Sequence, residues 1–523
     1  MQGAEQSRSS AAGGRYAWYV LGVLFLVYAV NLIDRQILSI LAQDIKADLG
    51  ASDAQLGFLY GTAFAIFYSL FGIPLGRLAD GWHRTRLIAL GLALWSGLTA
   101  LSGFAGTFGQ LAAARVGVGV GEASASPAAY SLLADYFPRE QRGLALAIYS
   151  AGALVGLALS LPIGGAIAHA WTSHFAVGNA PLGLAGWQAA FLAVGVPGLL
   201  MAAWALTLRE PPRGLADGHP LPARRPGVWR DFAREVGSIL PPFTLWSVAR
   251  IPGGLRVNLL LLVGVGAAAA AMARLSGDAL QWSAIGVGAY ATGSWAQQLR
   301  ATDRPTFVLL WGTPAAVLAL LSCGFLAFMG YALAFWVPPY AMRTFHIASD
   351  VAGLKIGVPQ GLAAAAGVIF AGRVSDAWKR HEPRARIYLC MLTMILSPPL
   401  VYATLSVGDA HTLYLLNPLA VFVVGSQVGN GAAMIQDCVL PRMRGTAGAT
   451  YLLVFSLLGL ALGPYCVGKV SGLTGSLRLG MLSIFVMTPA ALLVMWQAAR
   501  RLPLAEASKV ERAREAGERA SDT

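Results

Sequence analysis

Four charged residues stand inside long apolar segments of this sequence. Asp34 and Arg35 are adjacent in the first such segment, and Arg115 and Glu122 belong to a later one. Asn31 precedes the first pair by three and four residues, which places all three side chains on one face of a helix. Arg115 and Glu122 are two helical turns apart, so they also point one way. A charge at the centre of a membrane helix costs ~2.5–3.5 kcal/mol on insertion scales, and charges retained there usually mark proton or substrate routes.

The composition is that of an integral membrane protein. Of 523 residues, 56% are hydrophobic and 12% are charged, with a mean hydropathy of +0.60, whereas a soluble domain has about 25% charged residues. The apolar segments are long and continuous, which favours spanning helices over the alternating strands of a barrel. The net charge of +13 does not indicate nucleic-acid binding, because the charges lie between apolar segments, as in the loops of membrane proteins.

No pattern in the sequence indicates an enzyme, a cofactor or a metal site. The four cysteines lie in apolar runs or at their ends, without disulfide or zinc-site spacing. The run GVGVG at 117–121 lacks the preceding strand and the later acidic residue of a dinucleotide-binding loop, so close helix packing explains it better. Because the sequence has no ATP-binding loop, we expect energy from a gradient rather than from a nucleotide.

The apolar segments form two sets of six, separated by a long interval. They cover approximately 16–41, 54–79, 86–106, 109–135, 143–170 and 187–208, then 310–342, 350–375, 385–406, 411–437, 444–470 and 474–499. Lys and Arg alternate across the loops, so the positive-inside rule places both termini in the cytoplasm. The interval contains two uncharged stretches, 257–273 and 279–299, each able to reach or nearly reach across a ~30 Å hydrocarbon core. We expect an inserted transmembrane hairpin; the alternative is two helices lying in the interface.

The predicted organisation has six parts. They are a cytoplasmic N-terminal tail (1–15), a first six-helix bundle (16–208), a basic cytoplasmic linker (209–256), the inserted hairpin (257–299), a second six-helix bundle (300–500) and a charged cytoplasmic tail (501–523). The two sets of six are related, because GRLADGW (76–82) recurs as GRVSDAW (372–378), ASD (51–53) recurs at 348–350, and DYFPREQRGLA (135–145) matches DCVLPRMRGTA (437–447). The spacing of these matches predicts a duplicated unit with a substrate path between its copies.

Several motifs resemble those of the major facilitator superfamily. GRLADGWHRTR resembles its loop motif, departing from it at Gly81 and His83, and RVGVGVGEA (115–123) resembles its fourth-helix motif. GLALGPYCVG (459–468) resembles the antiporter motif, although that motif usually lies on the fifth helix. NLIDRQILS, SDAQLGFLYG and GEASASPAAYSLLADYFP resemble the spinster branch most closely. The resemblance covers the twelve core spans and implies the two-bundle fold with pseudo-two-fold symmetry, but not the hairpin.

The resemblance also implies roles for the buried charges, because helices one and four line the central cavity of this superfamily. Asp34 and Glu122 would couple protons and, with Arg35 and Arg115, would form a two-plus-two charge cluster. Together with Asn31, the two arginines would bind an anionic substrate. An arginine that exchanges a carboxylate for a substrate would link protonation to binding. The alternative interpretation is a static salt-bridge lock.

Two further groups of residues are candidates. By resemblance, a cytoplasmic gate is formed by Gly76, Asp80, Arg84 and Asp135, with Asp376, Arg380 and Asp437 as repeat counterparts; the alternative is helix capping and topology marking. Phe328, Tyr331 and Phe335 recur at helical spacing and, with Gln427 and Asn430, could face the cavity. Lipid-facing aromatic residues would have the same spacing.

We therefore predict a proton-coupled, alternating-access secondary transporter. The resemblance to the spinster branch implies an amphiphilic anion as its substrate, such as a lysolipid or sphingoid phosphate. The partners expected are this substrate, protons and membrane lipids, without nucleic acid, and we expect a monomer in a bacterial-type inner membrane. The alternatives are a proton-driven drug or organic-anion exporter of the same superfamily and, from another class, a transport-inactive receptor or scaffold.

Overall fold

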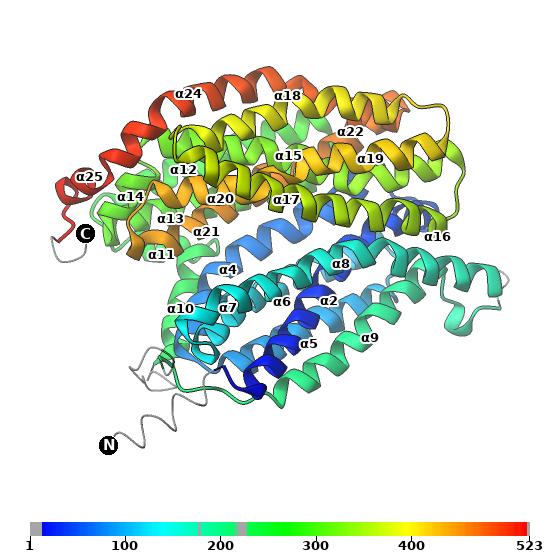
Figure 1. Cartoon of the computed structure of the whole chain (residues 1–523), viewed down its shortest axis with the longest axis horizontal. Coiled ribbons are helices and arrows are strands. Elements are labelled where there is room, and N and C mark those ends of the chain that lie inside the picture. The colour runs from blue at the N-terminus through cyan, green and yellow to red at the C-terminus, as the bar shows by residue number, and fades with distance from the viewer. Residues whose placement is uncertain (1–12, 176–178, 215, 217–226, 520–523) are drawn as a thin grey trace. The chain divides into compact units, whose positions relative to one another are not determined.

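The computed structural model describes residues 13–175, 179–214, 216 and 227–519 (Figure 1). Every regular element in these ranges is a helix. Twelve of the described helices are long and apolar enough to cross a membrane, which confirms the predicted all-α membrane class. Parts of the predicted tails and linker, at 1–12, 215, 217–226 and 520–523, lie outside the described residues.

The first set of six spans follows the predicted order. Its elements are α2 (Arg15–Leu49), α3 (Asp53–Gly57), η1 (Phe58–Thr62), α4 (Ala63–Gly81), α5 (Arg84–Ser102), α6 (Phe108–Glu122), α7 (Ala125–Tyr136), α8 (Arg139–His174), η2 (Pro181–Gly183) and α9 (Gly186–Leu206). α3, η1 and α4 together form the second span, with a π-helical turn at η1. The fourth span is divided directly after Glu122, where the Ser124 hydroxyl donates to the Gly121 carbonyl over 2.8 Å.

The interval and the second set of six are also helical. The interval contains α10 (Val228–Ile239), α11 (Thr244–Val248), α12 (Gly254–Ser276), α13 (Ala279–Thr302) and α14 (Arg304–Leu310). Spans seven to nine are α15 (Pro314–Phe345), then α16 (Ser349–Ala352), η3 (Gly353–Gly357) and α17 (Val358–Lys379), then α18 (Ala385–Leu405). The remainder are α19 (Ala410–Gly425), α20 (Gln427–Asp437), η4 (Pro441–Met443), α21 (Arg444–Val454), η5 (Phe455–Leu460), α22 (Gly463–Thr474), α23 (Leu477–Ser483), η6 (Ile484–Met487), α24 (Thr488–Ala507) and α25 (Lys509–Glu515).

The described chain packs as two compact units, and each unit includes a short segment from the opposite half of the sequence. The first unit contains most of spans one to six together with residues 347–361, and α2 packs along α8 within it. Glycines make that packing close: a methyl group at Gly152 or Gly156 would overlap the backbone carbonyl of Phe25 or Ala29. Small residues allow this approach where lipid offers no hydrophobic driving force.

The second unit contains spans seven to twelve, the interval from residue 236 onward, and residues 51–70 of the second span. Residues 51–70 pack on the eleventh span, also through glycines. A side-chain carbon at Gly57 or Gly61 would collide with the carbonyl of Pro464 or Leu460. The equivalent segment in the first unit, 347–361, packs in the same manner, since a methyl group at Gly353 would overlap the Leu161 carbonyl.

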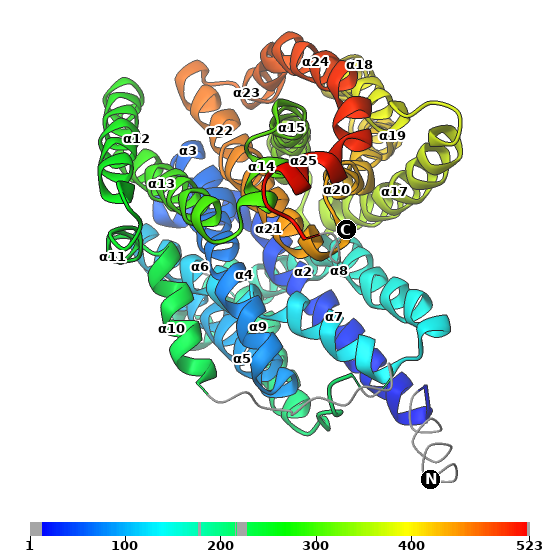
Figure 2. The same cartoon turned by 90° about the vertical axis from the view of Figure 1, so that its left-hand side faces the viewer.

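The inserted hairpin consists of α12 and α13, which lie side by side (Figure 2). Asn258 on α12 is fully buried and donates to Ser294 over 2.8 Å and to Gln297 over 3.0 Å. It also accepts a 2.6 Å hydrogen bond from the Tyr290 hydroxyl. Outside Gly254 and Asn258, the side chains of α12 are not buried, and α12 is one of the twelve candidate spans. α13 has 24 residues but is less apolar than those twelve.

The topology of the hairpin gives the first test. If α12 and α13 both span, a cysteine at Arg274, beside the α12–α13 turn, reacts with a membrane-impermeant maleimide added outside intact cells. Ala507→Cys at the end of α24 is the control and reacts only after the cells are opened, because both termini are expected inside. Labelling of Arg274→Cys only after opening the cells would instead place the two helices in the inner interface.

Candidate functional site

The four intramembrane charges come together in the first unit. Arg35 on α2 donates a 2.7 Å charge-assisted hydrogen bond to Glu122 at the end of α6. Arg115 donates to the backbone carbonyl of Asp34 over 3.3 Å, and its charge also faces the carboxylates of Asp34 and Glu122. Asn31 faces Glu122 from one turn earlier on α2. The five residues that the helix spacing and the family resemblance together selected therefore lie in one cluster.

The cluster is almost closed to solvent. Asp34 and Arg115 are fully buried, and Glu122 is 1% exposed. The Arg35 side chain has the greatest exposure among the four charges, at 12%. Its guanidinium therefore has a carboxylate partner and is not fully enclosed.

The local sequence explains how these groups are presented. α2 is helical through all the predicted span and continues to Leu49, where Gly50 ends it in a left-handed conformation (φ 62°). On α5, Trp95 and Thr99 lie one turn apart and face Asp34. The break after Glu122 separates α6 from α7, so Glu122 lies at a helix terminus rather than within a continuous rod. With both carboxylates ionised, the two acids and two arginines would have zero net charge in this low-dielectric interior.

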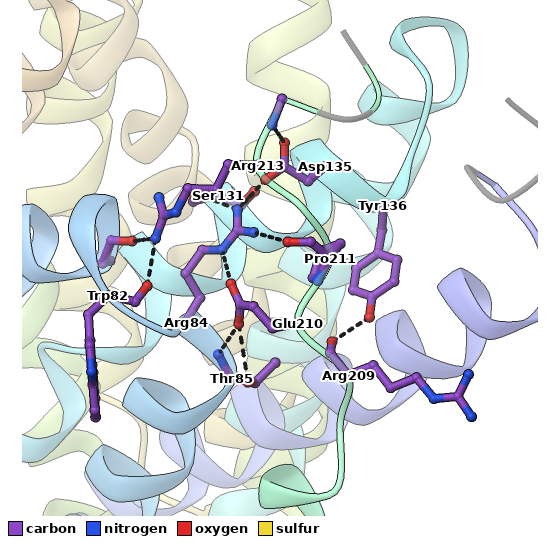
Figure 3. Close-up of polar contacts among 12 residues, drawn as sticks. Trp82, Arg84, Thr85, Ser131, Asp135, Tyr136, Arg209, Glu210, Pro211 and Arg213 are labelled. Atoms are coloured by element: carbon purple, nitrogen blue, oxygen red, sulfur yellow. Dashed lines mark hydrogen bonds and ion pairs between the residues drawn. The ribbon is translucent and has the colours of Figure 1, made fainter. Parts of the chain in front are cut away.

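A second cluster surrounds Arg84, at the connection between α4 and α5 (Figure 3). Arg84 is fully buried and forms an ion pair with Asp135. It also donates over 2.7 Å to Glu210 and over 2.9 Å to the carbonyl of Ser131. Glu210 in turn accepts hydrogen bonds from the backbone N–H and the hydroxyl of Thr85, at 3.0 and 3.1 Å. The carboxylate of Glu210 thereby caps the first turn of α5, where the helix dipole favours a negative charge.

The Arg84 cluster fixes the start of the linker. Arg213 donates to the carbonyls of Ala79 and Trp82 over 2.6 Å each, at the C-terminal end of α4 (Figure 3). Burial, together with the neighbouring Arg84 charge, lowers the pKa of Arg213, although Asp80 and Asp135 oppose this. At predicted Gly76, an added side-chain carbon would make only ordinary van der Waals contact with Pro127. Within the described residues, the contacts found for Arg84 all belong to the first unit; its predicted role as a gate stays a prediction.

The repeat counterpart of Arg84 differs from the prediction. Asp437 forms ion pairs with Arg386 and Lys379, and Arg386 also donates to Asp376 over 3.0 Å. Arg380, predicted from the 296-residue offset of GRLADGW, is exposed and has no ion pair among the described residues. The physical reason is a loop six residues longer in the second half, which changes the offset to 302 and places Arg386 at the position of Arg84.

The remaining predicted residues have partners in the second unit. Phe335 is fully buried and stacks on Tyr60, with ring centroids 4.5 Å apart, and Tyr331 packs against Phe455 at 5.6 Å. Phe328 is partly buried. Gln427 and Asn430 are buried at the break between α19 and α20, where their amides donate to the carbonyls of Leu326 over 2.9 Å and Ser426 over 3.2 Å. Their contact with substrate stays a prediction.

The sequence interpretation missed an ion pair in the second unit. Asp53, 4% exposed, accepts two hydrogen bonds from Arg343, at 2.7 and 2.6 Å, and a third from Ser471 at 2.6 Å. Three donors on one buried carboxylate hold α3 against α15 and α22. The repeated ASD motif could have identified Asp53 as a site, but it did not indicate Arg343 as the partner.

Two related sets of membrane-spanning helices, with two acidic and two basic side chains buried together, are typical of a secondary transporter. The chain matches the Major Facilitator Superfamily over residues 24–464, and it belongs to that family. This confirms the predicted fold class.

The similar proteins include several named spinster or spinster homologue, which confirms the predicted spinster branch. An MFS-type efflux pump of Mycolicibacterium smegmatis is 28% identical over 88% of this chain and 85% of its own length. Spinster homolog 1 of Xenopus tropicalis is 25% identical over 87% of this chain and 73% of its own. A crystal structure of a bacterial homologue of the human lysosomal transporter spinster, inward-facing and unoccupied, shares the fold with a TM-score of 0.69, 24% identity, and coverage of 96% of this chain and 99% of that one.

The Arg84 cluster gives a stability prediction. Arg84→Ala leaves the carboxylates of Asp135 and Glu210 without their guanidinium, and breaking a buried pair in this way costs roughly 3–5 kcal/mol. We expect a markedly lower Tm in detergent. Arg86→Ala, an exposed arginine in the same connection, is the matched control and should change the Tm little. Equal Tm values for both variants would show that the cluster does not stabilise the first unit.

Proposed function

We propose that this transporter is a proton-coupled secondary transporter that works by alternating access and moves an amphiphilic anion, such as a lysolipid or a sphingoid phosphate. The proposal rests on one observation above all: Asp34, Arg35, Arg115 and Glu122 form a buried cluster of two acids and two bases. A transport-inactive receptor or scaffold has no need of such groups, which are costly to retain within a membrane.

Charge balance supplies the coupling. With both carboxylates ionised, the cluster is neutral and both guanidinium groups have a negative neighbour. A proton taken up by Glu122 or Asp34 leaves the cluster with one net positive charge, which attracts an anion strongly in a low-dielectric interior. An anionic headgroup then takes the place of the neutralised carboxylate beside an arginine. Proton binding and anion binding therefore favour each other.

Arg35 is the group best suited to touch the substrate first. Its side chain is partly exposed, and a planar guanidinium binds phosphate or carboxylate oxygens in a bidentate manner. Arg115 is fully buried. Its positive charge would stabilise the ionised carboxylates of Asp34 and Glu122, and it would be the second arginine of the anion site. The acyl chain of an amphiphile would require an apolar path, for which Phe328, Tyr331 and Phe335 are proposed.

We further propose the orientation expected from the loops. Lys and Arg are concentrated at the connections that hold Arg84 and Arg386, and the positive-inside rule places such connections in the cytoplasm. Both termini would then be cytoplasmic in a bacterial inner membrane, with the protein acting as a monomer. The Arg84 and Asp437 clusters would lie at the cytoplasmic ends of the two halves.

A second candidate is the export of drugs or organic anions. It is favoured by the similarity to a Mycolicibacterium smegmatis protein named as an MFS-type efflux pump. A shorter match, 30% identical over 37% of this chain, is to a probable galactarate/D-glucarate transporter of Bacillus subtilis. Uptake assays in proteoliposomes with a lysophosphatidate, a dicarboxylic sugar acid and a cationic dye separate these classes.

The binding prediction follows from the charge balance. For the wild type, the affinity for a radiolabelled lysophosphatidate should rise as the pH falls, because protonation leaves the cluster positive. Glu122→Gln fixes the neutral form at one carboxylate, so this variant should bind well at both high and low pH. Arg35→Ala should lose roughly 1.5–3 kcal/mol of binding free energy, the value of hydrogen bonds to charged groups, and Arg35→Lys should recover part of it. A pH-independent wild-type affinity would contradict the coupling.

The transport prediction separates binding from energy conversion. Asp34→Asn should still bind the lysophosphatidate but lose transport driven by a pH gradient in proteoliposomes, because one proton site is removed while both arginines remain. Downhill exchange of labelled for unlabelled substrate is the control and should persist. Full gradient-driven transport by both Asp34→Asn and Glu122→Gln would show that the cluster is a structural lock or a substrate contact alone.

A further inference from the structure

The inserted hairpin contacts more than its own half of the protein. Gln281, near the start of α13, is 2% exposed, and its amide oxygen accepts a 2.7 Å hydrogen bond from the hydroxyl of fully buried Thr62. The same hydroxyl lies 2.7 Å from the Ala461 carbonyl oxygen, toward which the Gln281 amide nitrogen also points at 3.4 Å. Three segments far apart in sequence therefore share one buried polar contact.

The two segments that Gln281 joins both contain a π-helical turn at or next to the contact. Thr62 is the last residue of the π-helical turn η1. Ala461 directly follows the π-helical turn η5 and precedes the start of α22. π-turns inside helices frequently occur at functional positions. Close packing adds to the contact, because Gly61, beside Thr62, leaves no space for a side chain next to the Leu460 carbonyl.

A separate set of contacts already attaches the hairpin to α22. Asp278, at the α12–α13 turn, accepts a 2.7 Å hydrogen bond from the Tyr465 hydroxyl and forms a 2.8 Å ion pair with Lys469. Tyr465 also packs edge-on against Trp282. These partners belong to the eleventh span, in the same half of the duplicated sequence that follows the hairpin. Anchoring the hairpin therefore does not by itself require a bond to Thr62.

We propose that Gln281 makes the inserted hairpin a latch, which holds residues 51–70 of the second span on the eleventh span and so favours the conformation in which these two spans are packed together. The proposal rests on the alternating-access function proposed above. In such a cycle the second span moves with the first half and the eleventh with the second half. The Thr62–Gln281 hydrogen bond then exists in only one of the two states, and a contact made in one state alone shifts the balance toward that state.

Like the ion pair between Asp53 and Arg343, the latch holds residues 51–70 of the second span, but it does so through the hairpin. That ion pair joins the second span directly to the seventh span, whereas Gln281 works from a hairpin that the duplication does not contain. Gln281 is therefore a positioning residue for the conformational change.

The experiment measures the ratio of the two conformations by double electron–electron resonance. Spin labels replace exposed Phe104 and Leu479, in a background without the four native cysteines. Gln281→Leu and Thr62→Val remove the hydrogen bond with nearly unchanged volume. Each should shift the ratio toward the separated state by about threefold to fifteenfold, the range measured for hydrogen bonds between membrane helices. The double variant should shift it no further than Thr62→Val alone, because the bond that Gln281→Leu removes is also lost when the Thr62 hydroxyl is removed.

Two control variants make the result specific. Tyr465→Phe removes a hydrogen bond of the same length between the hairpin and α22, inside one half, and should leave the ratio unchanged. Leu260→Ala, on the exposed face of α12, should do likewise. A shift by Gln281→Leu that Tyr465→Phe reproduces, or additive shifts by Gln281→Leu and Thr62→Val, would overturn the latch while leaving alternating access intact. A single distance distribution for the wild type at every pH and substrate concentration would overturn alternating access and the latch together.

Discussion

The Arg35–Glu122 ion pair is the interaction on which the first unit depends. A guanidinium or a carboxylate alone in a membrane-spanning helix is expensive, and the two together remain tolerable only because their distance is 2.7 Å and the cluster is neutral. That requirement forces α2 and α6 to meet at fixed rotations. It also leaves the pair sensitive to a single proton, since neutralising one member exposes the charge of the other.

Close backbone packing supplies what the charges cannot. Lipid offers helices no hydrophobic gain on association, so contact area and small residues decide which helices lie together. Gly57 and Gly61 bring residues 51–70 against the eleventh span, and Gly353 brings residues 347–361 against the fifth. Both contacts involve the equivalent segment of the repeat. The duplication visible in the sequence is therefore present in the packing, with each unit using a segment from the opposite half.

The sequence was sufficient where few physical alternatives exist. In lipid a backbone must satisfy its own hydrogen bonds, so long apolar segments predict spanning helices directly. The i, i+3, i+4 spacing predicted that Asn31 and Arg35 share a helix face with Asp34, and the family resemblance added Arg115 and Glu122. It failed where partners are set by loops. Arg380 was predicted from the offset between GRLADGW and GRVSDAW, but six additional loop residues place Arg386 beside Asp437. Glu210 follows directly after the sixth span, and nothing in its local sequence indicates that it caps α5.

Gln281 is another residue whose partner the local sequence does not indicate. Gln297 and Gln298, near the other end of α13, have the same side chain. Their amides donate to the carbonyls of Gly254 and Ser238, which both lie within the interval. Only tertiary packing distinguishes the glutamine that reaches the second span. An insertion between the two halves of a duplicated transporter lies within the single connection that joins them. It can therefore be long without interrupting the packing of either bundle. It acquires a mechanical role when one polar side chain contacts the opposite half, and a single hydrogen bond is sufficient when the two conformations differ by a few kcal/mol.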